Sequence, residues 1–144
     1  MIKIPHYETS YFLFSNFSPH AIVYKGVLYP TLEHAFQAQK FLNEKIREEI
    51  RNAPSPLAAF KLGRKYSGKR DDWNEIKLNI MYELLKEKVL QHAEVKEALF
   101  KTENEEMIEE NPNDSFWGAG DDGMGENQMG KLLMKVRTEL KNTN

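Results

Sequence analysis

The first thirty residues place short apolar runs between turn residues, which is the pattern of extended chain. The aromatic run Tyr11–Phe14 and the segments Ala21–Tyr24 and Val27–Tyr29 are rich in aromatic and β-branched residues and predict strands. Lys25 and Gly26 separate the last two segments and predict a short hairpin turn. We therefore expect a small antiparallel β unit at the start of the chain.

The remainder of the chain carries the i, i+3, i+4 spacing of amphipathic helices. Thr31 and Ser55 are predicted N-caps, and Pro56 stands at a first helical position. The predicted helices cover residues 31–43, 45–51, 55–63, 71–89, 94–102 and 127–140. Residues 111–127 are rich in glycine and asparagine and predict an ordered loop. The pattern indicates an α+β fold: one mainly helical domain over residues 1–144 with a small antiparallel β unit.

The predicted helix over residues 33–42 has two different faces. Its polar arc holds Glu33, Gln37 and Lys40. Phe36 and Phe41 flank that arc, an unusual arrangement for a helix face in water, so we favour a pocket lined by phenylalanine and floored by polar groups. A solvated polar stripe is the alternative. The opposite arc is predicted to pack against another element and holds Ala35, Ala38 and Leu42.

Such a pocket supports chemistry at a sugar carbon. A carboxylate such as Glu33 can stabilise an oxocarbenium-like transition state or orient a water for attack. Lys40 can serve as a cationic anchor, a proton donor or an amine nucleophile that forms an imine. His34 points between the two faces and is interpreted as a hydrogen-bonding wall residue. With no Ser or Cys nearby, a hydrolytic triad is not supported.

The glycine-rich loop contains a formal G-x-G-x-x-G over Gly118, Gly120 and Gly123, which fails as a dinucleotide fingerprint. No predicted strand precedes it, and too few residues follow it for a βαβ unit. Its backbone amides and the following helix N-terminus suit an anionic group, Trp117 suits stacking on a base, and Asp114 suits a second carboxylate beside Glu33. The alternative is a structural turn cluster with Trp117 in the core. The acidic spacing in the loop does not match an EF-hand, and we predict no metal.

Charge and composition narrow the class of protein. The chain has 144 residues, with 20 Lys and Arg against 22 Asp and Glu, for a net charge of −2. Because the chain is nearly neutral, broad nucleic-acid coating is not expected. It has no cysteine, which excludes disulfides and thiolate sites. Residues 61–70 carry five basic residues and no acid, which indicates either a confined phosphate site or a solvated loop. No signal segment or membrane span is recognised, so we expect a cytoplasmic protein with no membrane partner.

Beyond these patterns, the chain resembles the NADAR family, also called YbiA-like, along nearly its whole length. The resemblance rests on Ser15-Asn16-Phe17 with Pro19, Tyr29-Pro30-Thr31, Glu33-His34, Phe36 to Phe41, Ser55-Pro56, Leu62-Gly63-Arg64, Trp73, Met81, Lys88, Asp114, Trp117-Gly118, Gly123, Gly125, Asn127, Gly130, Leu132-Leu133-Met134 and Arg137. Departures are small: Val89 stands where an aromatic residue is usual and Met129 where leucine is common.

The resemblance implies a largely helical α+β fold and hydrolysis of an N-glycosidic bond without a cofactor. It implies a phosphorylated ribosyl substrate, first of all the pyrimidine intermediates early in riboflavin synthesis. ADP-ribose attached to guanine, including in nucleic acid, is the alternative substrate. The family's essential positions fall on Glu33, Trp73 and Asp114, and Lys40 ends the main motif and is the candidate imine-forming or anchoring amine.

The hypothesis assigns a role to each candidate residue. Glu33, Asp114 and Lys40 are the catalytic candidates, with Asp114 as the acid/base partner of Glu33. The substrate-binding candidates are Asn16, Phe17, His34, Gln37, Arg64, Trp73, Trp117, Gly118, Gly120 and Asn127. Among them the two tryptophans stack on the leaving base, and Arg64, with Lys69 or Arg70, holds phosphate. A domain that binds ADP-ribose without cleaving it is the competing interpretation, and the two carboxylates count against it.

Overall fold

Two compact units make up the chain in the computed structural model, which describes residues 1–5 and 10–143. The continuous unit comprises Asn16–Gln91, and the composite unit combines Met1–Ser15 with His92–Asn144. Each unit combines helices with one two-stranded sheet, so the predicted α+β class is confirmed. In the described part of the chain, every helix is too short or too polar to span a bilayer.

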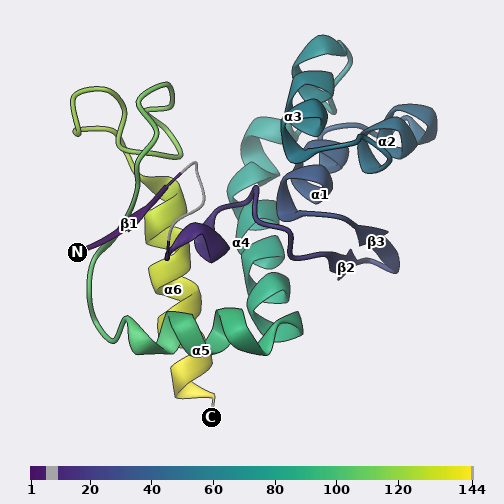
Figure 1. Ribbon diagram of the computed structural model, residues 1–144. Coiled ribbons are helices and arrows are strands. Elements are labelled where there is room, and N and C mark those ends of the chain that lie inside the picture. The colour runs from purple at the N-terminus through teal and green to yellow at the C-terminus, as the bar shows by residue number, and fades with distance from the viewer. Residues whose placement is uncertain (6–9, 144) are drawn as a thin grey trace. The chain divides into compact units, whose positions relative to one another are not determined.

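Helix α1 (Leu32–Gln39) is the centre of the continuous unit, because it contacts every other helix and strand of that unit (Figure 1). Those elements are β2 (Ile22–Tyr24), β3 (Val27–Tyr29), α2 (Glu44–Arg51), α3 (Pro56–Lys65) and α4 (Trp73–Gln91). All eight residues of α1 are buried, including four polar ones. Polar side chains are thereby held inside the unit instead of facing water.

The helix starts follow the predicted capping residues. The Thr31 Oγ1 accepts a hydrogen bond from the His34 amide, and the Ser55 Oγ accepts one from the Ala58 amide at 3.0 Å. Helix α1 ends four residues earlier than predicted, with Lys40 as its C-cap. The predicted packing of Leu42 is therefore wrong: it lies beyond the helix and its side chain is 66% exposed.

The antiparallel hairpin is confirmed. Strands β2 and β3 pair in the register that joins Ile22 to Tyr29. Lys25 and Gly26 form the two-residue turn with φ of 50° and 80°, the positive values that hairpin turns of this length require. The strand predicted at Tyr11–Phe14 is wrong, because Phe12–Phe14 forms a single 3₁₀ turn closed by a bond from the Ser15 amide.

The composite unit contains a parallel strand pair that the sequence patterns did not predict. Strand β1 (Ile2–Ile4) pairs with β4 (Met107–Glu109), and the unit's two helices are α5 (Ala93–Lys101) and α6 (Gln128–Asn142). Strand β4 contacts α6, and α6 contacts α5. Because β4 is only three residues long and follows a run of glutamates, its composition carries little strand signal.

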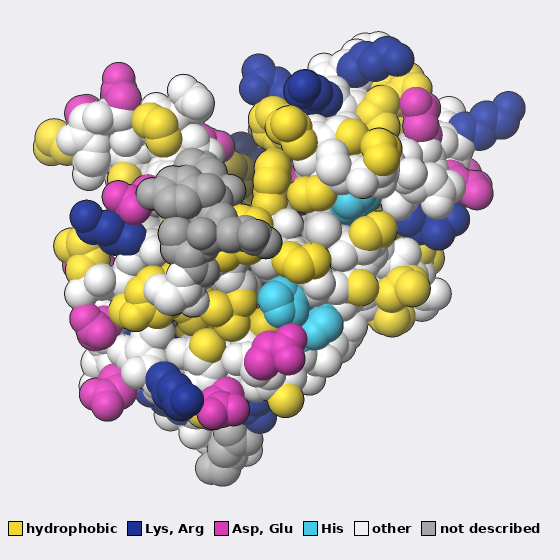
Figure 2. Space-filling view, viewed as in Figure 1, with side chains coloured by type: hydrophobic (Ala, Val, Ile, Leu, Met, Phe, Trp, Pro, Cys, Tyr) yellow, Lys and Arg dark blue, Asp and Glu magenta, His cyan; other side chains and the backbone are white. Residues whose placement is uncertain are grey.

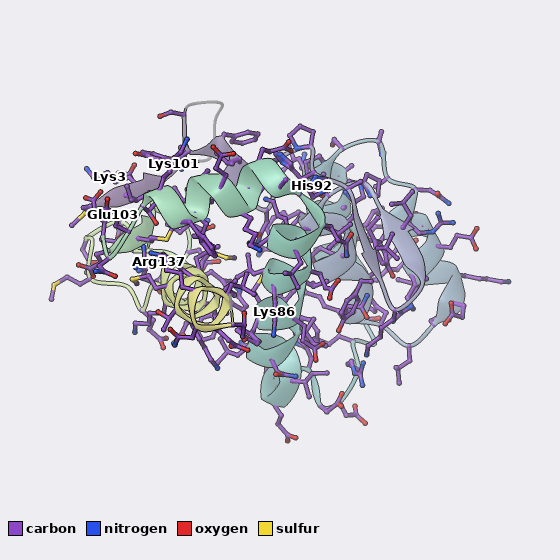
Figure 3. The ribbon with its side chains drawn as sticks, turned by 90° about the horizontal axis from the view of Figure 1, so that it is seen from below. Lys3, Lys86, His92, Lys101, Glu103 and Arg137 are labelled. Atoms are coloured by element: carbon purple, nitrogen blue, oxygen red, sulfur yellow. The ribbon has the colours of Figure 1, made fainter. Side chains whose placement is uncertain are left out.

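Arg137 of α6 ties the end of α5 to the chain that follows it. Its guanidinium donates to the Thr102 Oγ1 and to the Glu105 carbonyl, both at 2.9 Å. Figure 3 shows Arg137 facing the segment that contains Lys101 and Glu103. Arg137, one of the motif residues, thus has a structural role in this unit.

A buried lysine anchors the first segment of the continuous unit to α4. Lys88 is 2% exposed, and its Nζ donates to the Ser18 Oγ at 2.7 Å; that hydroxyl lies 2.8 Å from the His20 Nδ1. Nearer the start of α4, the Met81 sulfur accepts a hydrogen bond from the Asn16 side-chain amide at 3.6 Å. Burial lowers the pKa of Lys88 to about 7.

We predict that Lys88 makes stability depend on pH. Between about pH 7 and the ordinary lysine value near 10.5, the unfolded chain binds a proton that the folded chain does not. The free energy of unfolding should therefore rise with pH across this window. Below the window Lys88 is charged in the folded protein as well, and the full cost of burying that charge lowers the free energy of unfolding. Lys88→Met removes this dependence. Urea unfolding from pH 6 to pH 10 should therefore show the free energy of unfolding of the wild type rising relative to that of the variant.

Lys86→Met is the matched control, since Lys86 lies on α4 at a half-exposed position (Figure 3). Its pH dependence should match that of the wild type. A constant stability difference between the wild type and Lys88→Met across the whole range would contradict the prediction.

Candidate functional site

A cavity of about 400 Å³ opens in the continuous unit, where the end of α1, the end of α3, the loop after α3 and the start of α4 come together. It is lined by Lys40, Gly63, Arg64, Tyr66, Ser67, Gly68, Lys69 and Trp73. Three of these residues are cationic and none is acidic. Lys and Arg side chains also gather on the surface over α3 (Figure 2). The cavity has the size of a small-ligand site and the charge to hold an anionic group.

Beside the cavity, the buried Glu33 carboxylate of α1 accepts a hydrogen bond from an uncharged side chain. The Gln37 Nε2 donates to the Glu33 Oε2 at 2.5 Å, and the two side chains are 3% and 7% exposed. Both come from the predicted polar arc, one helical turn apart. An N–H donor suits a carboxylate oxygen, which accepts hydrogen bonds, and the Gln37 amide brings no charge of its own.

Asn16 reaches the same region from the preceding segment. Its backbone carbonyl accepts a hydrogen bond from the Glu33 amide at 3.1 Å, at the start of α1. Its side-chain Oδ1 and the Gln37 Oε1 are buried and have no hydrogen-bond partner among the described residues. Two acceptors without donors, both in residues bonded to Glu33, suit a ligand that brings hydroxyl or amino groups.

Lys40 stands at the C-cap of α1 and lines the cavity. Its pKa is lowered first by burial and then by the neighbouring cations Lys69, Arg64 and Lys77, while Glu33 opposes the shift. Lys40 therefore loses its proton more readily than an ordinary lysine does. A neutral amine is the form that can attack a carbon atom.

Two phenylalanines support the aromatic residues of the cavity. The Phe36 ring lies 5.0 Å from the Trp73 ring, centroid to centroid, and the Phe41 ring lies 6.4 Å from that of Tyr66, edge to face. The two phenylalanines predicted to flank the polar arc thus pack behind cavity-lining aromatic residues. Trp73 was singled out in the sequence through the family resemblance alone.

His34 is held on both sides of its ring. Its Nδ1 lies 2.8 Å from the Thr31 Oγ1 and its Nε2 lies 3.0 Å from the Ala53 carbonyl oxygen. Burial lowers the pKa of His34. These contacts fit the interpretation of His34 as a wall residue, and direct contact with a substrate stays a prediction.

Three cations were predicted to hold phosphate, and two of them line the cavity whereas Arg70 does not. Arg64 and Lys69 line the cavity. The Arg70 guanidinium instead makes a two-pronged contact with Asp72, with distances of 2.6 and 3.2 Å, and that contact lowers the pKa of Asp72. Arg70 therefore has a local partner at the start of α4.

Sequence reasoning missed four of the lining residues: Gly63, Tyr66, Ser67 and Gly68. All four fall in the basic segment 61–70, whose charge asymmetry was the available signal. The half-buried Phe17 is not among the residues lining this cavity. Its predicted contact with substrate remains a prediction.

The other predicted site residues belong to the composite unit, where they build the glycine-rich loop. The Asp114 Oδ1 accepts from the Phe116 and Trp117 amides at 2.9 and 2.8 Å and closes the turn that starts the loop. The Trp117 ring meets the Phe116 ring edge to face at 4.9 Å. Whether Asp114 serves as the acid/base partner of Glu33 stays a prediction.

The backbone of this loop is hydrogen-bonded to itself. The amides of Gly120, Gly125, Gln128 and Met129 all donate to carbonyl oxygens between residues 111 and 119. These amides, including the first two of α6, are therefore already used and do not support a phosphate cradle at the helix N-terminus. At Gly118 a Cβ would lie 2.8 Å from the Asn111 Cβ, so the loop has no space for a side chain there.

Asn127 links the loop to β4. Its backbone is left-handed, with φ of 52°. Its side-chain Oδ1 accepts from the Glu109 amide and its Nδ2 donates to the Met107 carbonyl, both at 2.9 Å. These bonds give Asn127 a structural role, and its predicted contact with substrate is not needed to explain them.

Comparison with known proteins gives a consistent result. The NADAR domain model matches residues 5–141. The chain is 44% identical over 140 residues to the N-glycosidase YbiA of Escherichia coli (strain K12), covering 95% of this chain and 88% of that protein. It is 44% identical over 136 residues to the N-glycosidase Npun_R5314 of Nostoc punctiforme, covering 92% and 87%.

One larger protein and one solved structure are also similar. The riboflavin biosynthesis protein VVA0006 of Vibrio vulnificus is 39% identical over 127 residues, which are 88% of this chain and 35% of that protein. The NMR structure of the Escherichia coli protein YbiA aligns with a TM-score of 0.88 and 41% identity, covering 99% of this chain and 86% of that one.

We predict that Asn127 contributes to stability through its two side-chain hydrogen bonds. Asn127→Ala leaves an amide and a carbonyl of β4 without these partners, and it puts alanine in a left-handed backbone conformation. The free energy of unfolding should fall by about 1–3 kcal/mol, measured by urea titration. Gln128→Ala, whose side chain bonds only at the surface to Glu126, is the control and should change stability little. Equal stability of both variants would contradict the structural role.

Proposed function

Since this chain belongs to the NADAR family, and relatives that it matches over most of their length are N-glycosidases, we propose that it hydrolyses the C–N bond between a ribose and an amine or base in a phosphorylated ribosyl substrate. The observation that carries the proposal is the buried Glu33–Gln37 pair next to a cavity walled by cations and aromatic rings. A carboxylate and a phosphate site side by side are what such a substrate requires.

In the proposed reaction, Glu33 acts on the sugar carbon. As the C–N bond breaks, positive charge develops on C1 and the ring oxygen, and the buried carboxylate stabilises it or orients the attacking water. The water oxygen bonds to C1, and a proton passes to the leaving nitrogen. Asp114 is the sequence-based candidate for that proton transfer.

The cavity cations bind the phosphate in this proposal. Arg64 and Lys69 donate charge-assisted hydrogen bonds to the phosphate oxygens, and Trp73 presents an aromatic surface to the base. The unpaired acceptors of Asn16 and Gln37 are suited to ribose hydroxyls or to amino groups of the base. The site needs no cofactor for these steps.

For the substrate, we place the aminopyrimidine intermediates early in riboflavin synthesis first. The similarity to the riboflavin biosynthesis protein VVA0006 of Vibrio vulnificus supports this choice. ADP-ribose on guanine in a nucleic acid is the alternative. A domain that binds ADP-ribose without cleaving it is disfavoured, because a carboxylate buried beside the site adds nothing to the binding of an anion.

Lys40 offers a second route through a covalent intermediate. Its neutral amine attacks C1 while the base leaves with a proton; the sugar ring then opens to an imine between Nζ and C1. Water hydrolyses the imine and frees the lysine. If Lys40 only anchors the phosphate, no such adduct forms.

We predict that Glu33→Gln strongly slows turnover and leaves binding intact. The substituted glutamine keeps the shape of the side chain and removes its negative charge, so the rate should fall about 100-fold or more while affinity for ribose 5-phosphate is retained. The assay follows release of ribose 5-phosphate by mass spectrometry and ligand affinity by calorimetry. Glu44→Gln, at a side chain 90% exposed on α2, is the control. Unchanged turnover in Glu33→Gln would refute the catalytic role of this carboxylate.

The same assay separates the substrates. The wild type is given the aminopyrimidine ribosyl 5-phosphate and a guanine-ADP-ribosylated oligonucleotide in parallel. Release of ribose 5-phosphate from the first is expected, whereas release of ADP-ribose from the second alone favours the alternative substrate. Binding of ADP-ribose with cleavage of neither compound would overturn the enzymatic proposal.

We predict that borohydride distinguishes the two roles of Lys40. If the imine forms, reduction during turnover converts it to a stable secondary amine, and peptide mass spectrometry places a reduced sugar on Lys40. Lys40→Arg keeps the charge and should give no adduct. A wild-type enzyme that turns over substrate without trapping excludes the imine route and leaves the anchoring role.

A further inference from the structure

Gly63 lies inside α3, where glycine is an unfavourable choice. A helix-interior glycine costs about 1 kcal/mol relative to alanine, and Gly63 has none of the positive φ values that would require glycine. Gly63 is also buried and lines the cavity. Its presence therefore needs an explanation in packing.

The explanation is the Gln37 side chain of α1. A Cβ added at Gly63 would lie 2.0 Å from the Gln37 Oε1, 2.8 Å from its Cδ and 3.3 Å from its Cβ. The amide of Gln37 thus fills the space in which any other residue would place its first side-chain carbon. With Gln37 in this conformation, only glycine fits at position 63.

The same amide is the one that holds Glu33. The Gln37 Nε2 must face the carboxylate at 2.5 Å, since a carboxylate only accepts hydrogen bonds. The Oε1 is then turned toward Gly63, where no donor meets it among the described residues. The Gln37 amide therefore contacts Gly63 through its oxygen and Glu33 through its nitrogen.

We propose that Gly63 is a positioning residue for Glu33: the missing side chain at Gly63 lets the Gln37 amide reach the carboxylate. This inference rests on the proposed function, in which Glu33 acts on the substrate. A methyl group at position 63 forces Gln37 into another rotamer, because a 2.0 Å separation is far inside van der Waals contact. Glu33 then loses the hydrogen bond from Gln37 and the orientation that this bond gives it. The flexible Gln37 side chain can move, so the fold survives.

The test is a double-mutant cycle between positions 63 and 37. Gly63→Ala should lower kcat about 10- to 100-fold and change KM less than about threefold, with no loss of thermal stability. In a Gln37→Ala background, Gly63→Ala should have no further effect on kcat, because the side chain that it displaces is gone. Leu57→Ala, exposed on the same helix and outside the cavity lining, is the control for helix propensity and should behave like the wild type.

A second measurement does not depend on activity. The side-chain amide signals of Gln37, observed by ¹⁵N NMR, should shift in Gly63→Ala and remain unchanged in Leu57→Ala. Unshifted signals, or equal losses of kcat from Gly63→Ala in both backgrounds, would overturn the positioning role. If the signals shift but Glu33→Gln turns over normally, Gly63 positions Gln37 and the proposed role of Glu33 has failed, so the two failures are distinguishable.

Discussion

The constraint on which the continuous unit depends is the burial of a polar helix. All eight residues of α1 are buried, and four of them, Glu33, His34, Gln37 and Gln39, carry polar side chains. A buried polar group without a partner costs free energy, so the surrounding elements must supply hydrogen bonds at fixed places. This requirement determines how the neighbours of α1 pack.

Most of these polar groups are satisfied by structural partners. His34 bonds to Thr31 and to the carbonyl after α2, and the Gln39 amide donates to the Tyr29 hydroxyl of β3 at 3.3 Å. Among the described residues, the two buried side-chain atoms left without partners are the Asn16 Oδ1 and the Gln37 Oε1. Both residues bond to Glu33. The two unpaired hydrogen-bond acceptors thus belong to residues next to the one carboxylate of α1, where a substrate would supply the missing donors.

Local signals in the sequence predicted local structure well. The caps at Thr31 and Ser55, the turn at Lys25 and Gly26, and the helices of both units follow from side-chain chemistry within a few residues, and the predicted family and fold class are confirmed. The failures are non-local. The β1–β4 pair joins residues about a hundred positions apart, and α1 ends early because Lys40 caps it and Phe41 turns inward.

For the site, periodicity placed Glu33, Gln37 and Lys40 on one face of a helix, and that placement depends only on α1. The partners of that face could not be derived in the same way. Trp73 starts another helix, and Gly63 reaches Gln37 only through the packing of α3 on α1. A glycine is typical of a helix end, so the predicted helix over residues 55–63 stops at Gly63, whereas α3 continues to Lys65. Its actual role is visible only when the second helix is in place.

The choice of a neutral donor for Glu33 has an electrostatic consequence. A cation in the place of Gln37 would hold the carboxylate as firmly, and it would also cancel the negative charge that a developing oxocarbenium ion needs. An amide holds the carboxylate through one N–H and adds no net charge. The cations Arg64 and Lys69, which line the cavity, can then serve the phosphate. Glu33 is thus held by a neutral group, and the missing side chain at Gly63, where α3 packs on α1, leaves room for that amide.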